Sequence, residues 1–174
     1  MTGLIIGRFQ PFHNGHLQVV RWIAEREQRI IIGIGSAQES HTMSDPFTAG
    51  ERYAMIHETL KTEVARELFI VPMEDLNRNS LWVAHVLSLS PSFDRVYTNN
   101  PLVKELFEEY ASGKEVVCPP IFKRKVLTGR KIRELMLEGK DWKSYVPAAV
   151  ADVIERVDGV QRIRSIAGSD EVES

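Results

Sequence analysis

Two histidines, an arginine and several small or rigid residues lie together in residues 7–16, whose sequence is GRFQPFHNGH. An apolar run precedes this segment and a helical pattern follows it, so we expect a strand, a tight turn and the start of a helix. The first turn of a helix carries unpaired backbone N–H groups and a partial positive charge, which favour a bound phosphate. His13, His16 and Arg8 add hydrogen-bond donors and charge at the same place. The segment therefore predicts a site for a highly anionic ligand such as a nucleoside triphosphate.

Short apolar runs alternate with helical patterns along the chain. The runs predict five strands, at residues 4–7, 30–34, 68–71, 96–98 and 115–118. The helical patterns lie at residues 17–27, 49–61, 81–88, 102–110, 128–138, 147–156 and 161–167. Apolar runs of this length are typical of strands buried on both faces of a parallel sheet. Their alternation with helices predicts an α/β fold, a doubly wound five-stranded parallel sheet with C-terminal helices.

The loops that follow the predicted strands carry the unusual residues of the chain. In a doubly wound sheet, ligands bind beyond the carboxyl ends of the strands. Four such loops contain polar, aromatic or rigid residues, at 7–16, 36–47, 73–82 and 99–101. We therefore expect these loops to share one edge of the sheet and to build the functional site there.

Other phosphate-binding motifs do not compete with residues 7–16. The chain has no GxxxxGK[ST] segment, and residues 33–36 lack the third glycine of a dinucleotide fingerprint. This disfavours a P-loop ATPase and a standard dehydrogenase.

Residues 7–16 match the G-x-F-x-P-x-H-x-G-H signature of the nucleotidyltransferase superfamily. Gly7 lets the turn approach a ligand closely, and Gly15 removes a side chain beneath the phosphates. Six further segments resemble the archaeal-type nicotinamide-nucleotide adenylyltransferases: residues 33–38, 40–42, 45–52, 82–83, 100–103 and 146–147. The resemblance covers residues 3–167.

The resemblance implies a Rossmann-like nucleotidyltransferase fold and a particular reaction. AMP would pass from ATP to nicotinamide mononucleotide (NMN), giving NAD and pyrophosphate. The resemblance also implies Mg²⁺, a cytoplasmic location and a homo-oligomer, often a hexamer. We find no cluster of metal ligands in the sequence and assign no metal-binding residue, since Mg²⁺ usually bridges phosphate oxygens and keeps its waters.

A second superfamily motif, S-x-T-x-[IV]-R, is matched in part by residues 128–133. Thr128 stands in for the serine, and Ile132 and Arg133 match. Arg130 replaces the middle threonine, so we assign it no role. The alternative interpretation of this basic segment is a solvated helix face.

The implied step is attack by the phosphate of NMN on the α-phosphorus of ATP. A phosphate monoester has a second pKa of about 6 and needs no strong general base at neutral pH. The protein must hold two anions in line and neutralise the leaving pyrophosphate. We expect His13 and His16 to donate hydrogen bonds to the triphosphate, with Arg8 and Arg133 supplying permanent charge.

The remaining candidates are expected to bind the two substrates. Around ATP we expect Gly7, Phe9, Gly15, Ser36, Asn99, Thr128 and Ile132; around NMN we expect Asp75, Asn79 and Trp82. An aromatic ring and amide partners suit a nicotinamide. Core packing is the alternative for Phe9 and Trp82, and an ordinary turn or cap is the alternative for Asp75 and Asn79. Residues 40–42 form either a polar lid or a plain loop.

Composition bounds the remaining possibilities. The chain has 174 residues, 43% hydrophobic and 26% charged, with a net charge of −2. We expect a single domain over residues 1–168 and a frayed acidic tail over 169–174. The net charge argues against a nucleic-acid binder, and we expect neither a membrane span nor a secretory leader. Cys118, the one cysteine, excludes an internal disulfide and fits a reducing cytoplasm.

Three alternatives to NMN adenylylation remain. Another enzyme of the superfamily would use a different acceptor, such as phosphopantetheine, or transfer a cytidylyl group. A nucleotide-sensing module would bind ATP without turnover. A tRNA-charging enzyme with a similar turn is disfavoured because the chain lacks the length and a basic tRNA-binding domain. The sequence leaves the choice between the amide and acid forms of the mononucleotide open.

Overall fold

The computed structural model describes residues 1–122 and 127–172, and it contains a five-stranded parallel sheet with helices on both faces. The strands are β1 (Thr2–Gly7), β2 (Arg29–Ile34), β3 (Glu67–Pro72), β4 (Arg95–Tyr97) and β5 (Glu115–Val117). The helices are α1 (Asn14–Ala24), α2 (Ala49–Glu63), α3 (Asn79–Leu89), α4 (Pro101–Tyr110), α5 (Gly129–Leu137), α6 (Ala148–Arg156) and α7 (Gly159–Val172), with a short 3₁₀ helix at Lys143–Tyr145. The strand order β3-β2-β1-β4-β5 confirms the doubly wound sheet predicted from the sequence.

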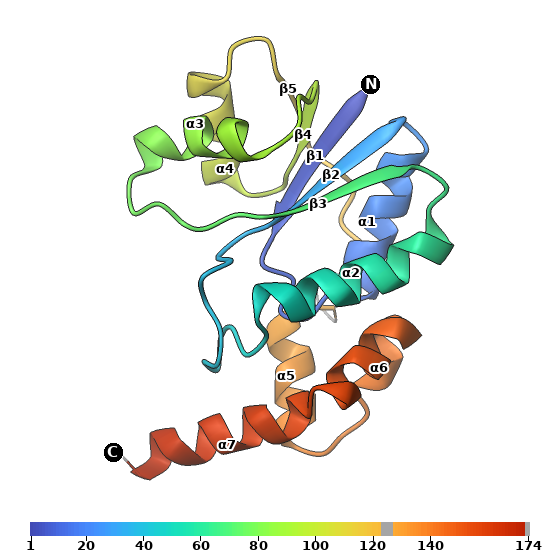
Figure 1. Cartoon of the computed structure of the whole chain (residues 1–174), viewed down its shortest axis with the longest axis vertical. Coiled ribbons are helices and arrows are strands. Elements are labelled where there is room, and N and C mark those ends of the chain that lie inside the picture. Colours follow the sequence, from blue (N-terminus) through green and yellow to red (C-terminus); the bar gives the residue numbers. More distant parts are fainter. Residues whose placement is uncertain (123–126, 173–174) are drawn as a thin grey trace.

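Each face of the sheet is covered by its own helices, with α1 and α2 on one side and α3 and α4 on the other (Figure 1). Successive strand residues point to opposite faces. Ile5 and Ile32 therefore join the core under α1 and α2, whereas Leu4 and Ile31 join the core under α3 and α4. This two-sided burial explains why the strands are continuous apolar runs. Because all the strand pairs are parallel, their carboxyl ends lie at one edge of the sheet.

Helices α5, α6 and α7 form a further layer beside α2 (Figure 1). A partly buried ion pair joins this layer to α2, because Arg162 donates to both carboxylate oxygens of Glu51 at 2.7 Å. Arg162 also donates to the backbone carbonyl of Pro46 at 3.0 Å. The C-terminal helices are thereby held against the loop between β2 and α2, and α5 begins near the end of β1.

The largest differences from the predicted helix bounds are in α1 and α7. Helix α1 begins at Asn14 rather than at residue 17, because His13 caps its N-terminus. Helix α7 is longer than residues 161–167 and extends into the tail that was expected to fray from residue 169. No proline interrupts it, and each added helical residue gains a backbone hydrogen bond. Residues 173–174 lie outside the described residues.

Among the described helices, none combines the length and the apolar character that crossing a lipid bilayer requires.

Candidate active site

A cavity of about 800 Å³ opens at the carboxyl ends of β1 and β4. Its walls come from the turn after β1, the residues after β4, residues 119–122 after β5 and the first turn of α5. Eight of the predicted site residues line it: Arg8, Phe9, His13, Gly15, His16, Asn99, Thr128 and Arg133. Both superfamily motifs therefore meet in one cavity, although more than 100 residues separate them along the chain.

His13 and His16 cap helix α1 reciprocally. The backbone N–H of His16 donates to Nδ1 of His13 at 3.3 Å, and the backbone N–H of His13 donates to Nδ1 of His16 at 3.2 Å. The two rings are stacked with centroids 3.6 Å apart. Because each Nδ1 accepts a hydrogen bond, the hydrogen-bond network assigns the ring proton of each neutral imidazole to Nε2. The pair thus offers two Nε2–H donors to a ligand.

Burial keeps both imidazoles uncharged at neutral pH. Desolvation lowers the pKa of His13 from 6.5 to about 4. It also lowers the pKa of His16 well below its usual value, and the neighbouring His13 disfavours a second positive charge there. The two histidines are therefore neutral hydrogen-bond donors, and permanent charge in the cavity comes from arginine.

The buried histidines predict an acid-sensitive fold. The unfolded chain takes up protons on histidine below a pKa of about 6.5, whereas folded His13 takes one up only near pH 4. The unfolded state thus binds more protons between these values, and the free energy of unfolding should fall as the pH drops through this range. Urea unfolding at pH 7, 5.5 and 4.5 measures this loss. A His13→Asn variant keeps a capping acceptor without a titrating ring and should show a weaker pH dependence. Equal pH dependence in both proteins would contradict the prediction.

Glycines at the starts of α1 and α5 make room for these contacts. A Cβ at Gly15 would lie 3.1 Å from Nδ1 of His13, so the space that Gly15 leaves is taken by the imidazole. A Cβ at Gly129 would lie 2.7 Å from the carbonyl oxygen of Gln10, well inside van der Waals contact. The two helix starts can therefore approach the turn after β1 only because these positions lack side chains.

The two predicted arginines differ in how firmly they are held. Arg133 donates from Nε to the carbonyl of Met43 at 2.8 Å and from Nη1 to the carbonyl of Gln10 at 2.6 Å. It thus ties α5 to both the turn after β1 and the loop after β2. The side chain of Arg8 is 59% exposed, and its Nη1 lies 3.3 Å from Oδ2 of Asp45. Arg8 is consequently the less firmly held of the two cations.

Three residues of the partial second motif have different structural environments. Thr128 caps α5, with its hydroxyl oxygen accepting from the backbone N–H of Lys131 at 3.1 Å. Arg130 is 85% exposed at the edge of the cavity and pairs with Glu134 at 3.0 Å, one helical turn on. Ile132 is fully buried in the core, so its side chain does not line the cavity as expected for a nucleotide contact.

Two other residues predicted to contact ATP make contacts within the loops that form the cavity wall. Phe9 is buried at φ +52°, and its ring meets the edge of the His16 ring with centroids 4.9 Å apart. Asn99 donates to the carbonyl of Pro119 at 2.9 Å and so joins the loops after β4 and β5. Gly7 is the last residue of β1 and Ser36 lies just after β2, but neither lines the cavity.

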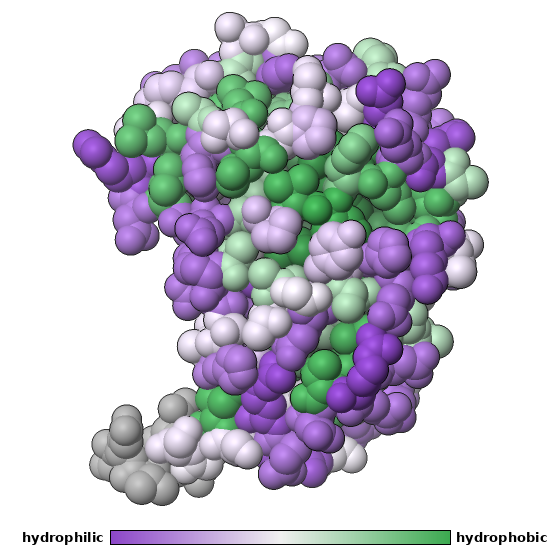
Figure 2. Space-filling view, viewed as in Figure 1, coloured by the Kyte–Doolittle hydropathy of each residue, from purple (hydrophilic) through white to green (hydrophobic). Residues whose placement is uncertain are grey.

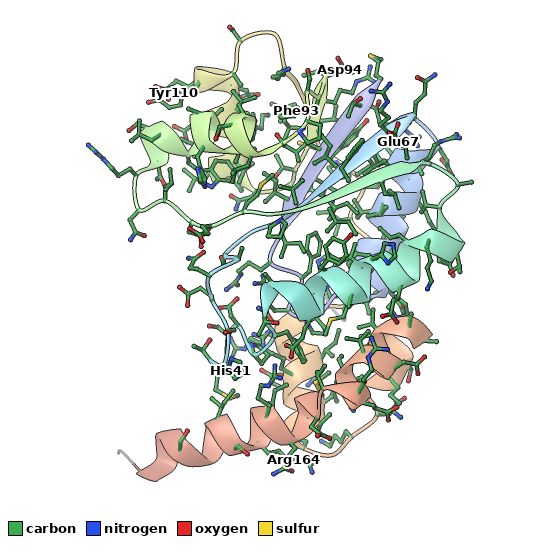
Figure 3. All side chains as sticks on the ribbon, in the orientation of Figure 1. His41, Glu67, Phe93, Asp94, Tyr110 and Arg164 are labelled. Carbon is green, nitrogen blue, oxygen red and sulfur yellow. The ribbon has the colours of Figure 1, made fainter. Side chains whose placement is uncertain are left out.

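The three predicted NMN residues lie outside the cavity lining. Asp75 is exposed, and its backbone N–H donates to Oε1 of Gln38 at 3.0 Å. Asn79 is exposed at the start of α3. Trp82 is half-buried, with its ring edge-on to Phe107 at 5.8 Å. All three follow β3 at the carboxyl edge of the sheet, next to the loop after β2. Figure 3 places His41 at the outer end of that loop, where its side chain is exposed.

Two residues that organise the site were not predicted. The side chain of Gln10 is buried and exchanges hydrogen bonds of 2.9 Å with the backbone N–H and carbonyl of Phe47. Arg52 is fully buried and donates to the backbone carbonyls of Arg8, Gly35, Ser36, Glu39 and Thr48 at 2.8–3.4 Å. Arg52 shares a helix face with the core residues Met55 and Ile56, and that spacing was the one available signal that it points inward.

Within residues 1–122 and 127–172, no three histidine, cysteine or carboxylate side chains converge as a metal site would require.

Comparison with known proteins agrees with the geometry. The profile of the Cytidylyltransferase-like family matches residues 4–135, so the fold and site define a nucleotidyltransferase enzyme. The chain is 53% identical over 171 residues to the nicotinamide-nucleotide adenylyltransferase of Picrophilus torridus, covering 98% of this chain and 100% of the relative. It is 53% identical over 168 residues to that of Methanothrix thermoacetophila, covering 97% of each. The chain belongs to the nicotinamide-nucleotide adenylyltransferase family.

A solved structure shares the fold. The bifunctional NMN adenylyltransferase/ADP ribose pyrophosphatase of Francisella tularensis, crystallised with AMP and a manganese ion, is 21% identical with a TM-score of 0.74. The match covers 94% of this chain and 52% of that protein, so the chain spans about half the length of that structure.

Proposed function

We propose that the protein adenylylates NMN in the cavity between β1, β4 and α5, producing NAD and pyrophosphate from ATP. The observation that carries this assignment is the capped histidine pair, whose two Nε2–H donors lie beside Arg8 and Arg133 in the same cavity. Neutral donors with cations beside them suit a triphosphate, because they stabilise charge that shifts toward the leaving group.

The proposed step forms a bond between a phosphate oxygen of NMN and the α-phosphorus of ATP. The bond from the α-phosphorus to the bridging oxygen breaks, and the electron pair leaves with pyrophosphate. Because the attacking monoester is already largely dianionic at neutral pH, no side chain has to remove a proton. His13 and His16 keep their Nε2 protons and donate to phosphate oxygens, while Arg8 and Arg133 offset the charge that accumulates on pyrophosphate.

Mg²⁺ is part of the proposal as a companion of ATP. Mg²⁺ commonly binds through substrate phosphates and retained waters rather than through a cage of carboxylates, which fits a cavity whose walls are histidine and arginine. When bound, the ion would neutralise phosphate charge. Asp75, Asn79 and Trp82 remain the candidates for holding NMN, at the same sheet edge but beyond the cavity lining.

Pyrophosphate release from ATP, measured with one acceptor at a time, tests the assignment. Release with NMN or its acid analogue, and not with phosphopantetheine, supports it. Faster release from CTP than from ATP would indicate cytidylyl transfer, and ATP binding without release with any acceptor would indicate a sensor.

The pH dependence of the reaction should follow the substrate rather than the histidines. Protonation of the NMN phosphate below its second pKa of about 6 weakens the nucleophile, whereas His13 titrates only near pH 4. We expect kcat/KM for NMN to fall below about pH 6. A phosphorothioate analogue of NMN, which has a lower second pKa, should shift this fall to lower pH. If kcat/KM falls at the same pH with both acceptors, the titrating group belongs to the enzyme and the prediction is wrong.

We also propose that the protein is a cytoplasmic homo-oligomer. Four apolar residues of the edge strand β3, at 68–71, are only half-buried, and three leucines of α3 are 39–47% exposed. Figure 2 shows hydrophobic residues at the surface over the part of the molecule where β3 and α3 lie. A second copy would cover this surface. Light scattering should then give a mass that is a multiple of 19.8 kDa, and a monomer at micromolar concentration would contradict the proposal.

A further inference from the structure

Asp45 is a buried carboxylate beside the predicted phosphate site. It lies in the loop between β2 and α2 and is 6% exposed. Its backbone N–H donates to the hydroxyl of Thr42 at 3.0 Å, which fixes its position. Oδ2 accepts from Nη1 of Arg8 at 3.3 Å, and Oδ1 is buried without a hydrogen-bond partner among the described residues. Burying a carboxylate with so few hydrogen bonds costs free energy, so Asp45 is expected to serve a function at this position.

Three arginines surround this carboxylate. Asp45 attracts the guanidinium groups of Arg52 and Arg133 as well as that of Arg8. Arg52 and Arg133 are both committed to backbone carbonyls. Arg8 and Arg133 both line the cavity, but only Arg8 of the three has a side chain that is mostly exposed. Asp45 therefore offsets mutual repulsion among the cations, and its bond to Arg8 is the one that can exchange.

The length of that bond supports exchange. Bonds between a guanidinium and a carboxylate are usually about 2.7–2.9 Å when strong, whereas this one is 3.3 Å. A phosphate oxygen entering the cavity would compete for the same Nη1 donor and carries more charge. Resting on the proposed function, we propose that Asp45 is a positioning residue that holds Arg8 beside the cavity, releases it to the triphosphate and takes it back as pyrophosphate leaves.

Asp45→Asn tests the proposal because it removes the charge and keeps the shape. Without its competitor, Arg8 should pair with phosphate more readily, so ATP and pyrophosphate should each bind roughly three- to tenfold tighter by calorimetry. KM for ATP should fall by the same factor with no rise in kcat. A residue with only a structural role would weaken binding when replaced. Unchanged or weaker binding in a folded Asp45→Asn protein would therefore overturn the proposal.

Two controls isolate the Arg8 contact. Glu58→Gln removes one carboxylate from a surface pair with Arg156 and should leave ATP binding unchanged. In an Arg8→Ala background, Asp45→Asn should no longer tighten binding, because the exchanging cation is gone. Wild-type protein that fails to bind ATP at all would refute the proposed function, whereas wild-type binding with no gain in Asp45→Asn refutes this inference alone.

A structure of the wild-type protein provides a second measurement, independent of how the variants fold. With α,β-methylene ATP, in which the scissile bridge cannot be cleaved, Nη1 of Arg8 should lie within hydrogen-bond distance of a phosphate oxygen and beyond 4 Å, the limit of a salt bridge, from Asp45. Arg8 still bonded to Asp45 in that complex would overturn the proposal.

Discussion

Replacing His16 with alanine is expected to lower kcat by about 10²–10³-fold, the loss typical of removing one donor from a charge-stabilising site. His16 presents a neutral Nε2–H to the cavity because its Nδ1 accepts the backbone N–H of His13. Donors fixed before the reaction need no reorganisation as charge moves onto pyrophosphate. The measurement is the rate of pyrophosphate release at saturating ATP and NMN.

The same ring caps α1, so loss of the cap must be separated from loss of the donor. His16→Asn keeps an oxygen where Nδ1 accepts from His13, but it has no group at the position of Nε2. It should be nearly as stable as the wild type and yet as slow as His16→Ala. His57→Ala, which removes an exposed imidazole on the outer face of α2, should be fully active. Near-normal turnover by His16→Ala would remove the histidine from the proposed mechanism.

The site could be predicted from sequence where its contacts are local. A strand, turn and helix follow one another within residues 2–24, so the spacing of His13 and His16 was enough to place both at a helix start. Their mutual capping was not predicted, because histidine is not among the residues usually expected at this position. The expected start at residue 17 was three residues too late for that reason.

Helical periodicity accounts for the burial of one predicted ATP-binding residue. Ile132 belongs to a superfamily motif, but it lies three and four residues before Leu135 and Met136, which place it on the buried face of α5. Motif membership alone suggested a ligand contact, whereas the period of the helix indicates core packing. For Trp82, periodicity could not distinguish core packing from ligand binding, because α3 is apolar on several sides.

The long-range contacts could not be predicted, since they join groups that the sequence does not distinguish. Arg133 donates to the carbonyl of Met43, 90 residues away. Every residue has a carbonyl, so only the folded loops determine which of them face a given arginine. The hydrogen bonds between the Gln10 side chain and the Phe47 backbone could not be predicted for the same reason. This holds most of all for the backbone carbonyls that Arg52 contacts.

Arg52→Met is expected to reduce the free energy of unfolding by about 3–5 kcal/mol, the usual cost of removing one member of a buried charged network. The variant fills a similar volume but leaves the loop carbonyls of Arg8, Gly35 and Glu39 without their side-chain donor, and each unsatisfied buried group costs roughly 1–3 kcal/mol unless water reaches it. The carbonyls of Ser36 and Thr48 keep backbone donors. Urea unfolding measures the change. Arg156→Met, which breaks a surface pair with Glu58, is the matched control and should cost no more than about 1 kcal/mol.

The effect of Arg52→Met on the reaction follows from which carbonyls it loses. Arg52 donates to the carbonyl of Arg8 in the turn after β1, and to the carbonyls of Gly35 and Ser36 where the loop after β2 begins. Because the turn after β1 lines the cavity and the loop after β2 is hydrogen-bonded to that turn, KM for ATP should rise even in molecules that remain folded. Arg52→Lys keeps the charge but offers one ammonium in place of a planar fork, and it should recover only part of the stability. A stability loss below about 1 kcal/mol for Arg52→Met, within the range of exposed pairs, would show that the loops hold their shape without this residue. Arg52 would then not be needed to order the walls of the cavity.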